Sequence, residues 1–203
     1  MFNTKEKTER RLGVKLFLKA HRCNSPKCVM IRHGYRPGLH GQGRHVSSEF
    51  GQQLNEKQKI KASYGLREVH LRRVFEAALK NPGITGAMMI QLLERRLDNV
   101  VFKLGIASSR SVARQLVGHG HIQVNGKNVK ASSYLTKVGD KISIRPASKN
   151  HQQFSGLGEK FKTFEPEIWL RLDKDKLVGE VVALPKDFDV PFDVNMVVDY
   201  YSK

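Results

Sequence analysis

The sequence predicts an α+β protein with a basic extended N-terminal arm, a small all-helical region and an α/β region with a mainly antiparallel sheet. Apolar residues recur at helical spacing between about residues 71 and 117, which is typical of helices with one buried face. Asn125-Gly126 then separates two short strand-like segments, and this dipeptide favours a two-residue hairpin turn. A surplus of positive charge ends near residue 150.

The positive charge is concentrated in the first three quarters of the chain. Residues 1–80 hold 18 Lys and Arg against 6 Asp and Glu, residues 81–150 hold 11 against 3, and residues 151–203 hold 7 against 10. Like charges repel one another in a compact state, so this surplus does not serve stability. It suits a polyanion, because each neutralised phosphate releases condensed counterions. Nucleic acid is therefore the predicted partner, and RNA is favoured by the motifs below.

Length and composition exclude several other classes. The 203 residues suffice for one large domain or two small ones. No apolar run approaches the roughly 20 residues of a membrane span, and the first residues lack the apolar core of a secretory signal. Two cysteines do not form a disulfide framework. We expect no membrane partner and a reducing, cytoplasmic location.

Residues 1–42 are predicted to form the extended basic arm. Cations recur every few positions, and the segment from Gly34 to Gly43 carries four glycines and a proline, which interrupt regular structure. So basic a segment buries little apolar surface and usually orders on its partner.

Three helices are predicted after the arm. The first carries apolar residues from Leu71 to Leu79 and ends at Asn81-Pro82-Gly83. The second begins at Thr85 and continues to Gly105, with Arg95, Arg96, Asp98, Asn99 and Lys103 on its polar face. The third is capped by Ser108 or Ser109, directs Arg110 and Arg114 outward, and stops at Gly118 or Gly120.

The remaining elements are mostly strands. Residues 122–124 and 127–129 flank the Asn-Gly turn, whose two central positions require positive φ. A second turn at 138–141 precedes Ile142 and Ile144, and a last pair of strands is predicted at 168–172 and 177–184. By pattern alone, residues 194–201 are compatible with either helix or strand.

Several motifs resemble a known family. The run "ERRLDNVVFKLGIASSRSVARQLVGHGHIQVNGKNV" (residues 94–129) resembles the start of the alpha-L RNA-binding module. "RLDNVV" (96–101), "PGLHGQ" (37–42), "LNEKQK" (54–59) and "YYSK" (200–203) resemble the bacterial family of small-subunit ribosomal protein number four. The resemblance covers essentially the whole chain, and its motifs fall in the family's order.

The resemblance implies an architecture. It gives a basic arm at 1–42, a helical domain at 43–90 completed by 185–203, and an inserted α/β domain at 91–184 with the module at about 94–145. The C-terminus returns to the helical domain in this arrangement, so residues 194–201 are expected to be helical.

The resemblance also implies a non-enzymatic function without a cofactor. Family members bind small-subunit ribosomal RNA, nucleate assembly of its 5′ domain and contact ribosomal protein number five. They lie near the mRNA entry channel, where they influence decoding accuracy, and they often repress their own mRNA. Our predicted RNA-binding side chains are Arg10, Arg11, Lys15, Arg22, Arg32, Tyr35, Arg36, His40, Arg44, Lys57, Lys59, Arg72, Arg95, Arg110, Arg114, His119, His121 and Lys127.

A zinc site is the main alternative for the arm. Cys23 and Cys28 form a short knuckle, and some family members complete it with a second cysteine pair upstream, giving four thiolates. Here Glu6 and Glu9 occupy the matching positions. His21 and His33 could substitute, but we predict no bound metal and an arm held by RNA instead.

Two rival functions fit the sequence less well. An RNA-modifying enzyme with an appended module would need a catalytic domain, which the flanking sequence lacks; Asp98 is better explained by local pairing with Arg95 on a helix. A free ribosome-associated stress factor would be little longer than the module, and the long basic arm argues against it.

Overall fold

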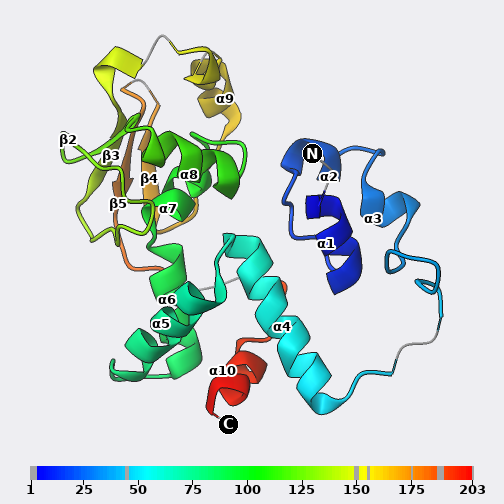
Figure 1. Ribbon diagram of the computed structural model, residues 1–203. Coiled ribbons are helices and arrows are strands. Elements are labelled where there is room, and N and C mark those ends of the chain that lie inside the picture. Colours follow the sequence, from blue (N-terminus) through cyan, green and yellow to red (C-terminus); the bar gives the residue numbers. More distant parts are fainter. Residues whose placement is uncertain are drawn as a thin grey trace. The chain divides into compact units, whose positions relative to one another are not determined.

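The computed structural model describes residues 4–43, 46–148, 151–154, 156–174, 176–186 and 190–202. The chain divides into two compact units, which are drawn in Figure 1. The first unit contains Met1–Ile90 and Phe188–Lys203, and the second contains Gln91–Asp187. The predicted arm and the predicted helical domain thus fall within the same unit. None of the helices in the described part of the chain is long and apolar enough to cross a membrane.

The N-terminal segment is less extended than the sequence predicts. It forms three short helices, α1 (Thr4–Leu12), α2 (Ala20–Cys23) and α3 (Val29–Arg32). Leu12, Leu16, Cys23 and Cys28 are buried among them. The prediction of an arm with little core of its own is therefore wrong in this respect, because these few apolar side chains, widely spaced in the sequence, converge when the chain turns.

The rest of the first unit is a small helical assembly. It consists of α4 (Glu49–Tyr64), α5 (Glu68–Leu79), the start of α6 (Thr85–Glu94) and α10 (Val194–Ser202). Figure 1 shows the red C-terminal helix α10 beside the cyan helix α4, and the two are in contact. Tyr201 stacks on Phe75, with ring centroids 4.9 Å apart. The helix predicted at 194–201 from the family resemblance is confirmed.

The prediction of one long helix from Thr85 to Gly105 is wrong, because this segment forms two helices. Helix α6 ends at Glu94, and α7 spans Leu97–Lys103. Arg96 is extended between them and forms a β-bridge with Leu135. The amides of Leu97 and Asp98 donate to the carbonyls of Tyr134 and Ser132. The 131–136 segment therefore takes donors that a continuous helix would have used internally.

The second unit packs helices on one antiparallel sheet. Its strands are β1 (Ile122–Val124), β2 (Lys127–Asn128), β3 (Lys141–Ile144), β4 (Leu170–Asp173) and β5 (Val178–Val181), in the order β2-β1-β3-β5-β4. Its other elements are α7, α8 (Arg110–Gly118), the 3-10 turns η1 (Pro146–Ser148) and η2 (Gln152–Phe154), and α9 (Leu157–Thr163).

Two details explain the packing of this unit. The predicted hairpin is confirmed: Asn125 and Gly126 have φ of 50° and 77°, and Val124 pairs with Lys127. A Cβ added to Gly179 on β5 would lie 2.3 Å from the Leu104 side chain. Glycine therefore lets the end of α7 approach the sheet closely, over a core that includes Leu97, Val100, Val101, Leu116, Ile122, Ile142, Ile144, Phe161 and Val181.

Candidate nucleic-acid interface

Helix α8 presents two arginines one turn apart. Its N-cap is Ser109, whose hydroxyl accepts a hydrogen bond from the amide of Val112, an arrangement that satisfies an otherwise unpaired donor. Its apolar side is buried through Ala113, Leu116 and Val117. Fixing that side directs Arg110 and Arg114 toward the N-terminal turn of α7.

A single buried carboxylate holds Arg114. Both Nε and Nη2 of Arg114 donate to Oδ2 of Asp98, at 3.0 and 2.7 Å. The same carboxylate accepts hydrogen bonds from Nε and Nη2 of Arg96, at 3.1 and 2.9 Å. The side chain of Asp98 is 3% exposed, whereas that of Arg114 is 36% exposed. Asp98 therefore neutralises Arg96 internally and positions Arg114 at the surface.

A buried amide plays the corresponding part for Arg110. Nε of Arg110 donates to Oδ1 of Asn99 at 2.8 Å, and its guanidinium lies over the Phe102 ring, 4.9 Å from the centroid. Nδ2 of Asn99 donates in turn to Oε2 of Glu94 at 2.7 Å. Lys103 also contacts this carboxylate, at 3.3 Å. The two α8 arginines are thus oriented by acceptors at the break between α6 and α7.

This arrangement corrects three sequence predictions. Arg96, Asp98 and Asn99 were expected on a polar face, but all three are buried. Asp98 does not pair with Arg95, whose Nε instead donates to the carbonyl of Thr136 at 3.0 Å. Arg110 and Arg114 are half-buried and engaged within the protein rather than simply projecting outward. The physical reason is the break after Glu94, which turns these side chains inward.

Exposed cations and histidines complete the surface of the second unit. Lys127, one of the predicted RNA-binding residues, lies exposed on β2. Other exposed cations, absent from the predicted set, include Lys130, Lys137, Lys141 and Arg145. His119 and His121 follow α8, and their rings are stacked 6.1 Å apart. Sequence spacing gave no signal for Arg145, which lies opposite His121 because its amide donates to that residue's carbonyl.

In the N-terminal segment, three predicted residues lie together. Nε of Arg10 donates to the carbonyl of Tyr35 at 3.0 Å, and its guanidinium stacks 4.9 Å from the Tyr35 ring centroid. Nη2 of Arg10 also reaches the carbonyl of Arg36 at 3.5 Å. Three other predicted residues of this segment are exposed, namely Arg11, Arg32 and His40, and Lys15 is half-buried. Arg22 forms an ion pair with Glu6 at 2.8 Å. Arg44 lies outside the residues that the structure describes.

The predicted cations of α4 and α5 are less available. Lys57 is buried, pairs with Glu68 at 3.0 Å and lies 4.0 Å from the Tyr200 ring centroid. Its ammonium is therefore committed to the fold of the first unit. Lys59 pairs with Glu56, while the exposed Arg72 pairs with Glu76 at 3.3 Å.

The residues around the cysteine knuckle do not fit a zinc site. One oxygen of Glu9 accepts hydrogen bonds from the backbone amides of Leu16 and Leu18, each at 3.1 Å. The Cys23 thiol lies 3.8 Å from the same carboxylate. Burial, followed by the charge of Glu9, raises the pKa of Cys23, so the thiol stays protonated. Among the residues the structure describes, no group of three or more His, Cys, Asp and Glu is placed to hold a metal. Glu9 acts instead as a hydrogen-bond acceptor for the turn.

Comparison with known proteins covers both units. Residues 2–94 match the family described as "Ribosomal protein S4/S9 N-terminal domain", and residues 95–142 match the "S4 domain". "Small ribosomal subunit protein uS4" of Caldicellulosiruptor bescii is 50% identical over 196 residues, covering 96% of this chain and 94% of that protein. The protein of the same name from Acetivibrio thermocellus is 48% identical, and uS4A of Alkaliphilus oremlandii is 49% identical, with the same coverage.

The fold, the cationic surface and the S4 domain define an RNA-binding structural protein rather than an enzyme. The chain belongs to the uS4 family of ribosomal proteins.

Proposed function

We propose that this chain is a structural component of the small ribosomal subunit that binds the subunit's ribosomal RNA directly. The supporting observation is the anchoring of Arg110 and Arg114 by Asn99 and Asp98. Side chains ordered before binding lose less entropy when the complex forms. An arginine fork also matches two phosphate oxygens at once.

Direct binding is tested with transcripts of the two ribosomal RNAs. At equal ionic strength, we expect the full chain to bind small-subunit RNA at least tenfold more tightly than large-subunit RNA, and to stay with small subunits through a high-salt wash. Equal affinity for both RNAs would leave only non-specific charge attraction, the sequence-independent part of binding. Release in the wash would contradict a structural role.

The proposal extends to the RNA region and the cellular setting that the family resemblance implies. The chain nucleates assembly of the 5′ domain, contacts ribosomal protein number five, and works in the cytoplasmic ribosome. Chemical probing of small-subunit RNA with the isolated chain should show protections confined to the 5′ domain. Protections spread over all domains would contradict nucleation.

A role near the mRNA entry channel, with effects on decoding accuracy, also belongs to the proposal, as does repression of the chain's own mRNA. Its support in this chain is the segment 35–43, in which Tyr35 and His40 are exposed and Arg36 is half-buried, because aromatic and guanidinium groups stack on unpaired bases.

A further inference from the structure

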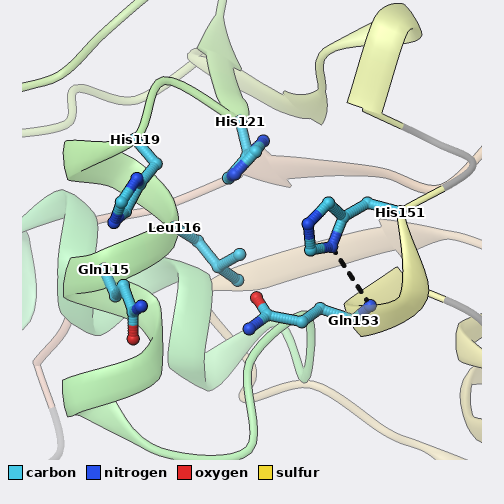
Figure 2. A pocket seen from close by; sticks show the side chains of 6 residues that line it. All are labelled: Gln115, Leu116, His119, His121, His151 and Gln153. Atoms are coloured by element: carbon cyan, nitrogen blue, oxygen red, sulfur yellow. Dashed lines mark hydrogen bonds between the residues drawn. The ribbon is translucent and has the colours of Figure 1, made fainter.

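Three histidines from separate elements surround one cavity in the second unit. His119 follows α8, His121 precedes β1, and His151 precedes η2. The cavity has a volume of about 110 Å³, and Figure 2 shows the three imidazoles around Leu116, with Gln115 and Gln153 alongside. The ring centroids of His121 and His151 are 5.3 Å apart, and those of His119 and His121 are 6.1 Å apart.

Among the residues that the structure describes, the titratable groups that face His121 are His119, His151 and Arg145, and each can carry positive charge. None of the described residues that line the cavity is a carboxylate. Burial, followed by the charges of His151, His119 and Arg145, lowers the pKa of His121. In the protein alone, therefore, the central ring is neutral near pH 7, because burial and the nearby basic groups both disfavour its charged form.

Hydrogen bonds hold two of the three rings in place. Nδ1 of His151 accepts the amide of Gln153 at 3.3 Å, so the proton of the neutral ring sits on Nε2. Nδ1 of His121 shares a hydrogen bond of 3.0 Å with the hydroxyl of Ser148. Both rings are thereby fixed by one nitrogen. The apolar floor at Leu116 is buried, which strengthens electrostatic attraction at the cavity.

We infer that this histidine cavity binds a phosphate group of RNA, and that the binding takes up protons on the histidine cluster. An anion among three imidazoles and a guanidinium cancels their mutual repulsion and favours the charged rings. A neutral base would bring no such gain. RNA affinity should therefore rise as the pH falls through the range in which histidine titrates. The inference rests on the proposed RNA-binding function.

The test measures the affinity of the full chain for small-subunit RNA at pH 6, 7 and 8 and at constant ionic strength. We expect affinity to rise about five- to tenfold from pH 8 to pH 6, the size expected when on average roughly half a proton is taken up across this range. The His119→Gln, His121→Gln, His151→Gln triple variant should lose this rise. The exposed His70→Gln change on α5 is the matched control and should keep it. His151→Gln alone, at an exposed position, should lose part of the rise without disturbing the fold.

A rise that survives in a folded triple variant, or affinity that does not change with pH, would overturn the inference while leaving RNA binding intact. No binding at any pH would overturn the proposed function together with it.

NMR titration of the imidazole protons supplies a second readout that needs no variant. Inorganic phosphate and a short oligoribonucleotide should each raise the pKa of His121. Perturbation by the oligoribonucleotide without a rise would mean that a neutral base occupies the cavity, and a rise with inorganic phosphate alone would mean a free anion. Either result contradicts the inference.

Discussion

The carboxylate of Asp98 is shared by two guanidiniums, one buried and one at the surface. Removing its charge leaves the buried Arg96 without a counter-ion, and breaking a buried ion pair typically costs about 3–5 kcal/mol. We predict that Asp98→Asn lowers the free energy of unfolding by about 3 kcal/mol and weakens RNA binding by releasing Arg114. Urea unfolding and RNA titration measure the two effects.

Glu165→Gln is the matched control for this prediction. Glu165 is an exposed carboxylate in the same unit, and exposed substitutions usually change stability by less than about 0.5 kcal/mol. If both variants unfolded at the same urea concentration, the hydrogen bonds of Asp98 would make no measurable contribution to stability, which would contradict the prediction.

The same network changes what a double alanine variant would report. If Arg110 and Arg114 projected outward, as the helical spacing predicts, Arg110→Ala with Arg114→Ala would weaken RNA binding without a change in thermal stability. Because the Arg110 side chain satisfies the buried oxygen of Asn99, its removal leaves that acceptor unpaired, which costs about 1–3 kcal/mol. Removal of Arg114 takes from Asp98 one of its two guanidinium partners, while Arg96 remains. Stability must therefore be measured before a loss of affinity is assigned to RNA contact.

At the scale of elements, the N-terminal turn depends on Glu9. This buried carboxylate accepts the amides of Leu16 and Leu18, which follow α1. We predict that Glu9→Ala speeds hydrogen exchange of those two amides at least tenfold, since one buried and one half-buried donor lose their acceptor. Glu9→Gln keeps an acceptor oxygen and should show a much smaller change. Equal exchange in both variants and the wild type would contradict the role of Glu9.

The same turn should hold no zinc. The Cys23 thiol, whose pKa is raised, and the Glu9 carboxylate, already used by amides, leave the turn without the four ligands of a structural zinc site. Elemental analysis of the purified chain should give well under one zinc per chain, and Cys23→Ser with Cys28→Ser should keep RNA affinity within about 1 kcal/mol. Stoichiometric zinc that disappears in this double variant would contradict the prediction.

Helices α4, α5 and α10 are joined at Glu68. Burial alone would raise the pKa of this carboxyl, but hydrogen bonds from Lys61, Tyr201 and Lys57 lower it to about 2. The ionised form is therefore favoured in the folded state, and its contribution to stability is lost as the pH falls from about 4.5 toward 2. We predict that Glu68→Gln flattens this part of the stability profile, measured by urea unfolding from pH 5 to pH 2.

Glu76→Gln removes a surface carboxylate from the same helix and should leave the stability profile unchanged.

Tyr201 provides a check at the other end of the pH range. Its hydroxyl donates to Glu68 at 2.7 Å, and burial, followed by this hydrogen bond, raises its pKa. Its stabilising effect should therefore persist until the pH exceeds about 10. A wild-type profile that is flat below pH 4.5 would contradict the arrangement around Glu68.

Elements whose cause is local could be predicted from the sequence, and those set by distant residues could not. The hairpin follows from Asn125 and Gly126 alone, since the required φ angles belong to these two residues. The break after Glu94 depends on carbonyls of residues 132 and 134, which no periodicity reveals. The burial of Asp98 and Asn99 follows from that same long-range pairing, and the position of Arg145 follows from a different one, between its amide and the carbonyl of His121. Helical spacing found Arg110 and Arg114 but not their acceptors.

At the scale of the whole molecule, the formal net charge of +17 should dominate association with RNA. On the order of 6–10 phosphate contacts give a slope of log affinity against log salt between about −4 and −9.

Lys127 is exposed on β2 and has no structural partner to lose among the described contacts. We predict that Lys127→Ala makes the slope shallower by about 1 with unchanged urea unfolding, whereas Lys176→Ala, an equal charge change in the acidic last quarter, leaves it unaltered. RNA titrations at several salt concentrations measure these slopes. A wild-type slope shallower than about −2, or equal changes in both variants, would mean that affinity comes from contacts other than phosphate pairing on this surface.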